Sequence, residues 1–329
     1  MAVSMAARRR PAAAAPDTLA PGEPLIQVRN LTKTFGTKTV VDQLSMTIEP
    51  GMLYGFLGPN GSGKTTAIRM MCGLVPPTSG EGRFMGYDIV RQAARIKPLL
   101  GYMTQHFSLY TDLTVRENLE FTCRLYGIRD IRRRVNELIE QFAFADGRDR
   151  QIVGTLSGGW KQRLALACAM SHKPRVLLLD EPTAGVDPKA REAFWDILQD
   201  IAASGVSVLV STHYMDEAMR SNRIAYVLYG RLLVDDAPEQ VLAKSDLVAA
   251  QVELKERVSP ERERRLAHDE RLVRFSRQGN SYRIVARSPS DVAGWVQRLG
   301  APAGEVRPID VGLEDIFFHL TLQQQTTSF

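Results

Sequence analysis

The chain has 329 residues, of which 44% are hydrophobic and 24% charged, as in an ordinary globular protein and unlike a disordered or fibrous one. Its longest apolar run, Leu164–Met170, has seven residues, whereas a membrane-spanning helix needs about 20, so we expect no membrane span. The net charge of +5, part of which lies in Arg8–Arg10, is only weak support for nucleic-acid binding, which usually requires a clustered basic face.

The three cysteines, Cys72, Cys123 and Cys168, lie far apart and form no CxxC pair. This spacing argues against a disulfide framework and a zinc ribbon, and it favours a reducing cytosol. At about 150 residues per domain, the length predicts about two domains.

Residues 1–24 are mostly Ala, Pro and Arg, with few large apolar side chains. Such a segment buries too little surface to offset the entropy of ordering, so we predict a disordered tail. The alternative is an arm that binds anionic lipid or RNA. The apolar stretch after the arginines is too short for a signal peptide.

Residues 25–243 alternate short β-rich runs with longer helical segments. Continuous apolar strands joined by helices are typical of a parallel α/β sheet, and the segment from about 91 to 170 is mostly helical, as in an inserted helical subdomain. The predicted strands are 25–30, 52–57, 175–180, 206–212 and 224–229, and the predicted helices of the subdomain are 115–126, 131–143 and 157–170.

The pattern changes in residues 246–329, which we predict to form a C-terminal accessory domain. Strands and helices there follow the order β-α-β-β-α-β, which is typical of a small α+β domain of the ferredoxin-like type, and a last helix follows. The predicted elements are 247–255, 259–268, 270–276, 281–287, 290–299, 304–309 and 313–321. We expect this domain to stabilise a dimer or to regulate the protein.

A phosphate-binding loop follows the strand 52–57. The sequence has the full G-x-x-x-x-G-K-[ST] pattern between a strand and a helix, the context that this motif requires. Its glycines allow successive N–H groups to point at the β- and γ-phosphates, Lys64 adds a positive charge, and the Thr65 hydroxyl suits Mg²⁺. The predicted nucleotide-binding residues are Gly58, Pro59, Asn60, Gly61, Ser62, Gly63, Lys64, Thr65 and Thr66.

The strand 175–180 ends in two adjacent carboxylates, Asp180 and Glu181. A carboxylate at the tip of a strand beside a phosphate loop is well placed to hold Mg²⁺. Because successive side chains of a strand point to opposite faces, the two groups cannot do the same job. One can hold the metal while the other faces a water.

A Ser-Gly-Gly turn, Ser157, Gly158 and Gly159, opens the helix predicted at 157–170. Free N–H groups, a helix N-terminus and a hydroxyl make it a second candidate anion site, and a plain helix N-cap at Ser157 is the alternative. With these motifs, residues 25–243 resemble the ATPase subunits of ATP-binding-cassette (ABC) transporters. In that family a Leu-Ser-Gly-Gly-Gln signature closes on the γ-phosphate of ATP held by the partner subunit, and this chain has Trp160 in place of the Gln.

The resemblance assigns roles to four further residues. Gln105 resembles the Q-loop glutamine, which meets Mg²⁺ and links to the membrane subunit. Asp187 ends a variant of the D-loop and is expected to take part in nucleotide binding. His213 matches the switch histidine that contacts the γ-phosphate, and Phe35 stands where an aromatic ring stacks on adenine. The alternatives are a core position for Phe35 and a hydrogen-bonded loop position for His213.

Three stretches resemble one branch of the family more closely. Residues 157–169, 211–218 and 312–321 look like those of the ATPases that serve type-two ABC exporters of the multidrug kind. The implied fold is an α/β P-loop NTPase core with a helical subdomain, followed by the accessory domain. The helical subdomain is expected to contact the membrane subunit.

The resemblance implies that the chain binds ATP and Mg²⁺ and uses hydrolysis to drive export through a separate integral membrane permease. Two copies in a homodimer would sandwich two ATP molecules, and a heterodimer is the alternative. Glu181 is expected to polarise the attacking water, His213 to orient the γ-phosphate and the water, and Thr65, Gln105 and Asp180 to hold Mg²⁺.

The implied location is peripheral, at the cytoplasmic face of the inner (plasma) membrane, and no nucleic-acid partner is expected. The exported substrate is not encoded in recognisable form. Two alternatives remain. One is a soluble ABC ATPase that acts on ribosomes or nucleic acid, and the other is a binding-only regulatory cassette.

Overall fold

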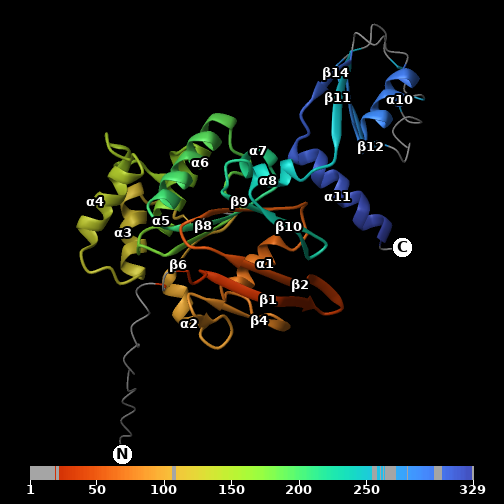
Figure 1. The fold of residues 1–329 in the computed structure, drawn as a ribbon. Coiled ribbons are helices and arrows are strands. Elements are labelled where there is room, and N and C mark those ends of the chain that lie inside the picture. The colour runs from red at the N-terminus through yellow and green to blue at the C-terminus, as the bar shows by residue number, and fades with distance from the viewer. Residues whose placement is uncertain are drawn as a thin grey trace, which may run out of the picture.

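The computed structural model describes residues 19, 22–105, 109–253, 258–259, 261, 263, 272–279, 281–299 and 306–327. The predicted tail therefore lies outside the described residues, except for Leu19 and residues 22–24. Most of the predicted helix 259–268 lies outside them as well. Figure 1 shows two parts, a larger body built on two sheets and a smaller sheet-and-helix unit near the C-terminus.

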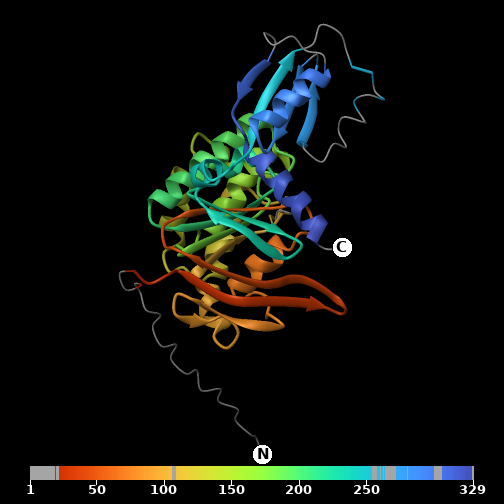
Figure 2. The same ribbon diagram turned by 45° about the vertical axis from the view of Figure 1, so that its right-hand side comes forward.

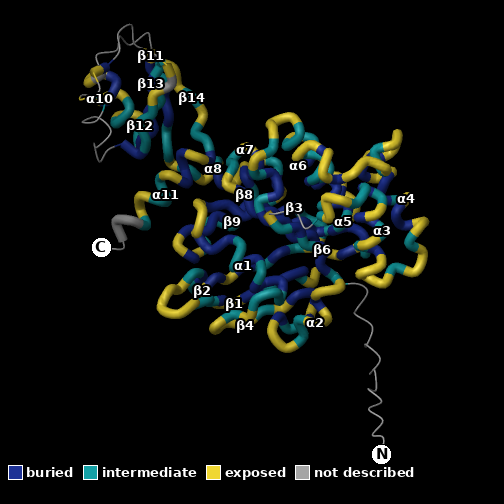
Figure 3. The backbone as a smooth tube through the Cα atoms, turned by 180° about the vertical axis from the view of Figure 1, so that it is seen from behind, coloured by how far each residue is buried: buried dark blue, intermediate teal, exposed yellow. Residues whose placement is uncertain are grey.

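The centre of the larger part is a six-stranded sheet of order β10-β9-β3-β8-β7-β6, parallel except for β10. All residues of β3, β7 and β8 are buried (Figure 3), as expected of a parallel sheet covered on both faces. The predicted strands at these positions are confirmed, with ends shifted by about one residue. The bounds are β3 Leu53–Leu57, β6 Leu100–Met103, β7 Val176–Asp180, β8 Ser207–Thr212, β9 Arg223–Leu228 and β10 Arg231–Asp236.

A second, antiparallel sheet of order β2-β1-β4-β5 packs on this body. Its strands are β1 Ile26–Phe35, β2 Lys38–Ile48, β4 Ser79–Phe84 and β5 Tyr87–Asp88. Helix α1 (Lys64–Met71) lies between the two sheets (Figure 1), and one apolar cluster joins its Ala67 and Ile68 to side chains of both. The strand predicted at 25–30 thus belongs to the antiparallel sheet and is longer than expected.

The inserted subdomain is helical, as predicted, with one difference. Helices α3 (Val115–Leu125), α4 (Ile131–Gln141) and α5 (Gly158–Ala169) share an apolar cluster with α6 (Pro188–Ala203). Strand β6, within the range expected to be mostly helical, pairs with β7 at the edge of the central sheet. The remaining short helices are α2 Ala93–Ile96, η1 Lys97–Leu99, η2 Arg148–Arg150 and η3 Val153–Thr155.

The C-terminal unit, drawn in cyan and blue in Figure 2, contains a four-stranded antiparallel sheet of order β12-β13-β11-β14. Numbered within the unit, this order is 2-3-1-4, the arrangement of a ferredoxin-like β-α-β-β-α-β sheet, so the predicted architecture is confirmed for the described residues. The bounds are β11 Val248–Glu253, β12 Leu272–Gln278, β13 Ser281–Ala286, α10 Pro289–Leu299 and β14 Val306–Ile309.

The last helix, α11 (Leu313–Thr327), contacts both parts of the molecule. At its start the buried Asp315 accepts hydrogen bonds from Arg283 (2.5 Å) and Arg274 (3.3 Å) of the small sheet. Further along, the Phe317 ring stacks on Tyr226 of β9, with ring centroids 4.1 Å apart. The helix predicted at 313–321 therefore packs against the central sheet as well as the small one. The short helices α7 (Met215–Ala218) and α8 (Pro238–Ala243) lie beside this contact.

Candidate functional site

The phosphate loop joins the buried strand β3 to α1, and two of its glycines are required by geometry. Gly58 has φ of 149°, and a Cβ built on it would lie 2.1 Å from the carbonyl oxygen of Val227. Gly63 has φ of 102°, and its Cβ would lie 2.4 Å from the carbonyl oxygen of Val40. Only glycine fits this conformation and this spacing, so the backbone can curl as the motif predicts.

Lys64, the first residue of α1, is 4% exposed and points back over the loop. Its Nζ donates to the carbonyl oxygens of Gly58 (2.7 Å) and Pro59 (3.1 Å) and lies 4.0 Å from Oε1 of Glu181. Burial lowers the pKa of Lys64 below its ordinary value, while the carboxylates of Glu181 and Asp180 oppose that shift. The ammonium is thus held at the floor of the loop by weak neutral acceptors that an anionic ligand can replace.

Asp180 ends β7 and is joined to the phosphate loop. Its Oδ1 accepts from the Thr65 hydroxyl (2.7 Å) and from the Ser211 hydroxyl (2.9 Å), and its Oδ2 accepts from Arg69 (3.3 Å). The two residues predicted to share Mg²⁺, Thr65 and Asp180, are therefore brought within hydrogen-bond distance. Ser211 and Arg69 fix the carboxylate from the other sides.

Glu181 follows in a strained backbone conformation, with φ of 45°, a region that costs a non-glycine residue about 1–3 kcal/mol. Its N–H donates to the Ser211 hydroxyl (2.9 Å), which helps to hold this conformation. The turn brings Oε2 of Glu181 to 3.7 Å from Nδ1 of His213. The predicted base and the predicted switch histidine are therefore neighbours, on two loops that leave adjacent strands.

A cavity of about 300 Å³ lies over the loop. Gln105, although far away in sequence, opens onto it together with Lys64 and Glu181. Ser62 Oγ, buried in the loop, has no hydrogen-bond partner among the described residues. The lining residues are Val40, Asn60, Gly61, Ser62, Gly63, Lys64, Thr65, Thr66, Gln105 and Glu181. Phe35 does not line this cavity; its ring is 52% exposed, with Lys33 Nζ 5.0 Å from the ring centroid.

The Ser-Gly-Gly turn is not brought to the phosphate loop of the same chain. Ser157 and Gly159 line a different cavity, of about 260 Å³, together with Trp160 and Asp187. Ser157 is the N-cap residue of α5, but its side chain makes no capping hydrogen bond. Asp187 caps α6 by accepting from the N–H of Ala190 (3.0 Å). The Ser157 side chain therefore does not cap its own helix.

Comparison with known proteins decides the family. The model of the ABC transporter family (ABC_tran) matches residues 41–184. The Nod factor export ATP-binding protein I of Cupriavidus metallidurans is 34% identical over 301 residues, which cover 90% of this chain and 97% of that protein. The chain belongs to the ATP-binding subunits of ABC transporters.

Other relatives of this ABC ATPase match in part. The "Probable multidrug ABC transporter ATP-binding protein YbhF" of Escherichia coli is 43% identical over 228 residues. That match covers 68% of this chain and 39% of YbhF, so the chain spans less than half of that relative. A dimeric, post-hydrolysis structure of the ATP-binding cassette MJ0796 bound to ADP and Pi is 26% identical, with a TM-score of 0.58 over 64% of this chain and 98% of that one.

The ABC ATPase site offers oxygen ligands for a magnesium ion. Thr65 and Asp180 meet at its edge, and the Gln105 amide opens onto the same cavity. Hydroxyl, carboxylate and amide oxygens suit Mg²⁺, which takes its other ligands from water and phosphate. No cluster of three or more His, Cys, Asp or Glu residues is found in the part of the chain that the structure describes. The residues present fit an ion that is shared with a nucleotide.

Sequence reasoning missed two residues of this site, Ser211 and Arg69. The Ser211 hydroxyl contacts both acidic residues, since it donates to the Asp180 carboxylate and accepts from the backbone N–H of Glu181. Arg69 lies four residues after Thr65 on α1, a spacing that places both on one helix face. That spacing is the only sequence signal for Arg69. Ser211 opens the stretch 211–218 that resembles the exporter branch, but nothing in this stretch indicates its two partners, which lie at the end of another strand.

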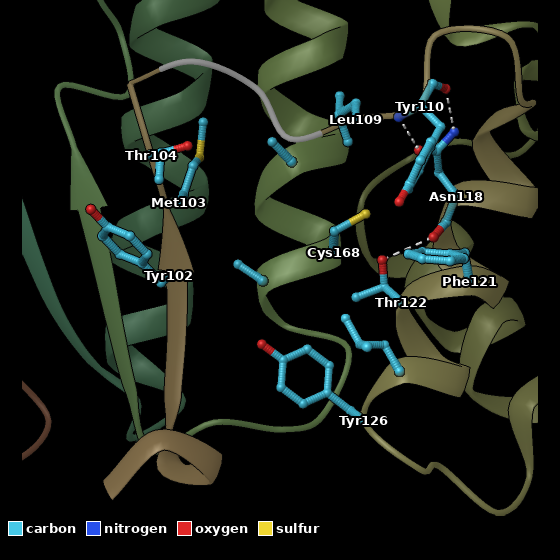
Figure 4. A pocket seen from close by; sticks show the side chains of 13 residues that line it. Tyr102, Met103, Thr104, Leu109, Tyr110, Asn118, Phe121, Thr122, Tyr126 and Cys168 are labelled. Carbon is cyan, nitrogen blue, oxygen red and sulfur yellow. Dashed lines mark hydrogen bonds between the residues drawn. The ribbon is translucent and has the colours of Figure 1, made fainter. Parts of the chain in front are cut away.

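The ABC ATPase also carries a half-open pocket of about 280 Å³ on the helical subdomain (Figure 4). In Figure 4, Tyr102, Met103 and Thr104 line one side, and Tyr110, Phe121 and Tyr126 come from the other. Strand β6 therefore carries residues of this pocket and ends two positions before Gln105. The remaining lining residues are Leu109, Asn118, Thr122, Leu125, Ala165, Cys168 and Ala169.

Proposed function

We propose that this chain hydrolyses ATP and that hydrolysis drives export through a separate integral membrane permease. The observation that carries the proposal is the grouping of Glu181, His213 and Lys64 around the phosphate loop. A binding-only cassette has no need of a carboxylate held in a strained turn next to a histidine. The relatives named for Nod factor export and multidrug transport support the direction of transport.

The chain's own residues divide the chemistry between them. Lys64 and the loop N–H groups bind the β- and γ-phosphates. Glu181 accepts a hydrogen bond from the attacking water and orients it, acting as general base, and His213, 3.7 Å from Glu181, binds the γ-phosphate on the other side. A magnesium ion held by Thr65, Asp180 and Gln105 would neutralise charge on the phosphates.

We propose that two copies of the chain complete two sites. The Ser157–Gly159 turn opens onto its own cavity, away from the phosphate loop of the same chain. A second copy related by two-fold symmetry can present this turn to the first copy's nucleotide, and the reverse contact follows from the symmetry. ATP at such an interface favours the closed dimer over the open one, which gives the differential affinity that a conformational change needs.

We propose that the pocket of Figure 4 receives the permease. It combines aromatic side chains with Leu125, which is 72% exposed, and exposed apolar clusters of this kind are typical of protein interfaces. No helix among the described residues is long and apolar enough to cross a membrane. From the proposed permease contact we propose a peripheral location, at the cytoplasmic face of the membrane, with substrate selectivity residing in the permease.

The ATPase proposal is tested with Glu181→Gln. We expect turnover to fall by roughly 10²–10⁴, while a fluorescent ATP analogue still binds, because Lys64 and the loop are unchanged. Glu120→Gln, which alters a partly exposed carboxylate paired with Arg124 on α3, is the control and should keep wild-type turnover. Near-normal turnover of Glu181→Gln would overturn the assignment of the base.

The permease proposal is tested by affinity capture from detergent-solubilised membranes, with mass spectrometry of the retained proteins. We expect one polytopic membrane protein, and we expect Leu125→Glu to lose it. Val90→Glu changes another exposed apolar residue, outside the pocket, and should retain it. Capture of ribosomal proteins or nucleic-acid enzymes instead would favour the alternative of a soluble ABC ATPase.

A further inference from the structure

A buried carboxylate outside the cavities joins the two loops that carry Glu181 and His213. Glu217, in α7, is 2% exposed. Its Oε1 accepts from the Thr183 hydroxyl at 2.6 Å, and its Oε2 accepts from the Thr212 hydroxyl. Burial of a carboxylate is costly unless its oxygens are hydrogen-bonded, and here each oxygen receives a hydroxyl from a different loop.

Both threonines adjoin residues of the proposed chemistry. Thr183 lies two positions after Glu181 in the turn that leaves β7, and its carbonyl oxygen accepts from the N–H of Val186 (3.2 Å). Thr212 ends β8 directly before His213, and its hydroxyl also accepts from the N–H of Tyr214 (3.1 Å). Glu217 therefore holds the turn after the base on one side and the backbone around the histidine on the other.

A third element completes the arrangement. Arg191, in the first turn of α6, has its Nε 3.9 Å from Oε1 of Glu217 and its guanidinium over the Tyr214 ring, 4.4 Å from the centroid. The Tyr214 ring in turn lies 4.1 Å from the ring of His213. The carboxylate thus lies at the centre of a network that includes both loops and the start of α6.

We infer that Glu217 is a positioning residue that holds the loops of Glu181 and His213 in fixed positions relative to each other. It lines neither the cavity over the phosphate loop nor the one beside the Ser-Gly-Gly turn, and it acts through Thr183 and Thr212. The inference rests on the proposed ATPase function. Because a carboxylate only accepts hydrogen bonds, it can receive both hydroxyls at once, whereas an amide of the same shape places a donor at one of the two positions. Glu217→Gln should therefore release one of the loops.

The first readout needs no nucleotide. Hydrogen–deuterium exchange of the free chain should be faster in Glu217→Gln over 181–187, over 212–216 or over both, by about tenfold or more. Asp216→Asn is the matched control, because Asp216 lies on the same helix with its side chain exposed and is 3.8 Å from Arg191. Unchanged exchange in both segments of Glu217→Gln, or the same change in Asp216→Asn, would overturn the inference.

The second readout is steady-state turnover. We expect kcat of Glu217→Gln to fall by about 10- to 100-fold, the size of effect that small misplacement of reacting groups produces, with KM for ATP within about threefold of wild type. A purely structural role predicts instead a fall in active fraction at unchanged kcat per folded molecule. Thr183→Val should likewise lower kcat with little change in KM for ATP. Thr183→Ser keeps the hydroxyl and should have the kcat of the wild type.

The two threonine variants also keep the inference testable if Glu217→Gln does not fold. The effects of Thr183→Val and Thr212→Val on kcat should not add, because both act through one carboxylate. Additive effects, or full activity in either valine variant, would refute the role of Glu217. A wild-type chain without ATPase activity would instead refute the proposed function, and the exchange experiment would still decide whether Glu217 joins the two loops.

Discussion

Removal of the Ser211 hydroxyl tests how the two acids of the site are held. In Ser211→Ala, Asp180 loses a hydrogen bond of 2.9 Å, and the N–H of Glu181 loses its side-chain acceptor but keeps the Ser211 carbonyl oxygen at 3.2 Å. The substitution removes no charge and only one oxygen atom. Any change therefore reports on the position of the two carboxylates.

The magnitude follows from the kind of bond that is lost. A hydrogen bond to a charged group contributes about 1.5–3 kcal/mol, so we expect Ser211→Ala to lose about 2 kcal/mol of stability. For a domain of this size that loss lowers Tm by roughly 4–8 °C. If the same energy is lost from the transition state, kcat falls by roughly 30-fold.

The assay compares Ser211→Ala with Ser207→Ala by thermal unfolding and by phosphate release. Ser207 lies on the same strand, β8, is 1% exposed and accepts a neutral hydrogen bond from the N–H of Gly51 (2.8 Å), away from the site. Its loss should cost about 1 kcal/mol and leave kcat unchanged. Equal kcat values for the two variants would refute the reasoning, because then the Ser211 hydroxyl would contribute only to folding.

Three further predictions concern the rest of the molecule. Burial raises the pKa of Cys72 to about 12, so only about 10⁻⁴ of this fully buried thiol is ionised at pH 8. Maleimide should therefore not label Cys72 until the chain is unfolded, and rapid labelling of Cys72 in the native chain would contradict this. Phe317→Ala should lower stability by about 3 kcal/mol, whereas Phe318→Ala, at a position 43% exposed, should stay within about 0.5 kcal/mol of wild type. Trp160→Gln removes an indole that two arginine side chains cover, and we expect it to lower the stability of the fold by about 1 kcal/mol. Scanning fluorimetry measures this as a lower Tm, and an unchanged Tm would show that these contacts contribute nothing to stability.

Four strands of the central sheet, β3, β7, β8 and β9, could be predicted because each contains a run of apolar residues. β7 and β8 are buried along their whole length, so their apolar pattern needs no partner to be recognised. The antiparallel sheet could not be predicted in the same way. β4 has the sequence SGEGRF, mostly exposed, and the pairing of β1 with β2 contains register shifts that interrupt the alternation. In the central sheet, the edge strand β6 was not predicted, because it is only four residues long.

In the candidate site, too, the residues of contiguous segments could be predicted, whereas contacts between distant segments could not. The phosphate loop is contiguous in sequence, so its residues could be assigned from the motif and its flanking elements. Ser211 and Glu217 lie in the stretch 211–218 that resembles the exporter branch, and Arg69 lies one helical turn after Thr65, but neither pattern indicates which residues these side chains contact. Their contacts join segments that are far apart in sequence, such as Thr65 with Asp180 and Thr183 with Glu217. Such contacts follow only from the arrangement of the strands.

The surface against which α11 packs also became known only from the structure. The apolar spacing of 313–321 predicts a helix with a buried face, but spacing alone does not say which surface covers it. In the structure that surface is β9, where Tyr226 stacks on Phe317. The next residue of β9, Val227, has the carbonyl oxygen that leaves no room for a side chain at Gly58. We expect a displacement of α11 to reach, through β9, the backbone that closes against the phosphate loop, and this is the route that we propose for the predicted regulatory role of the C-terminal region.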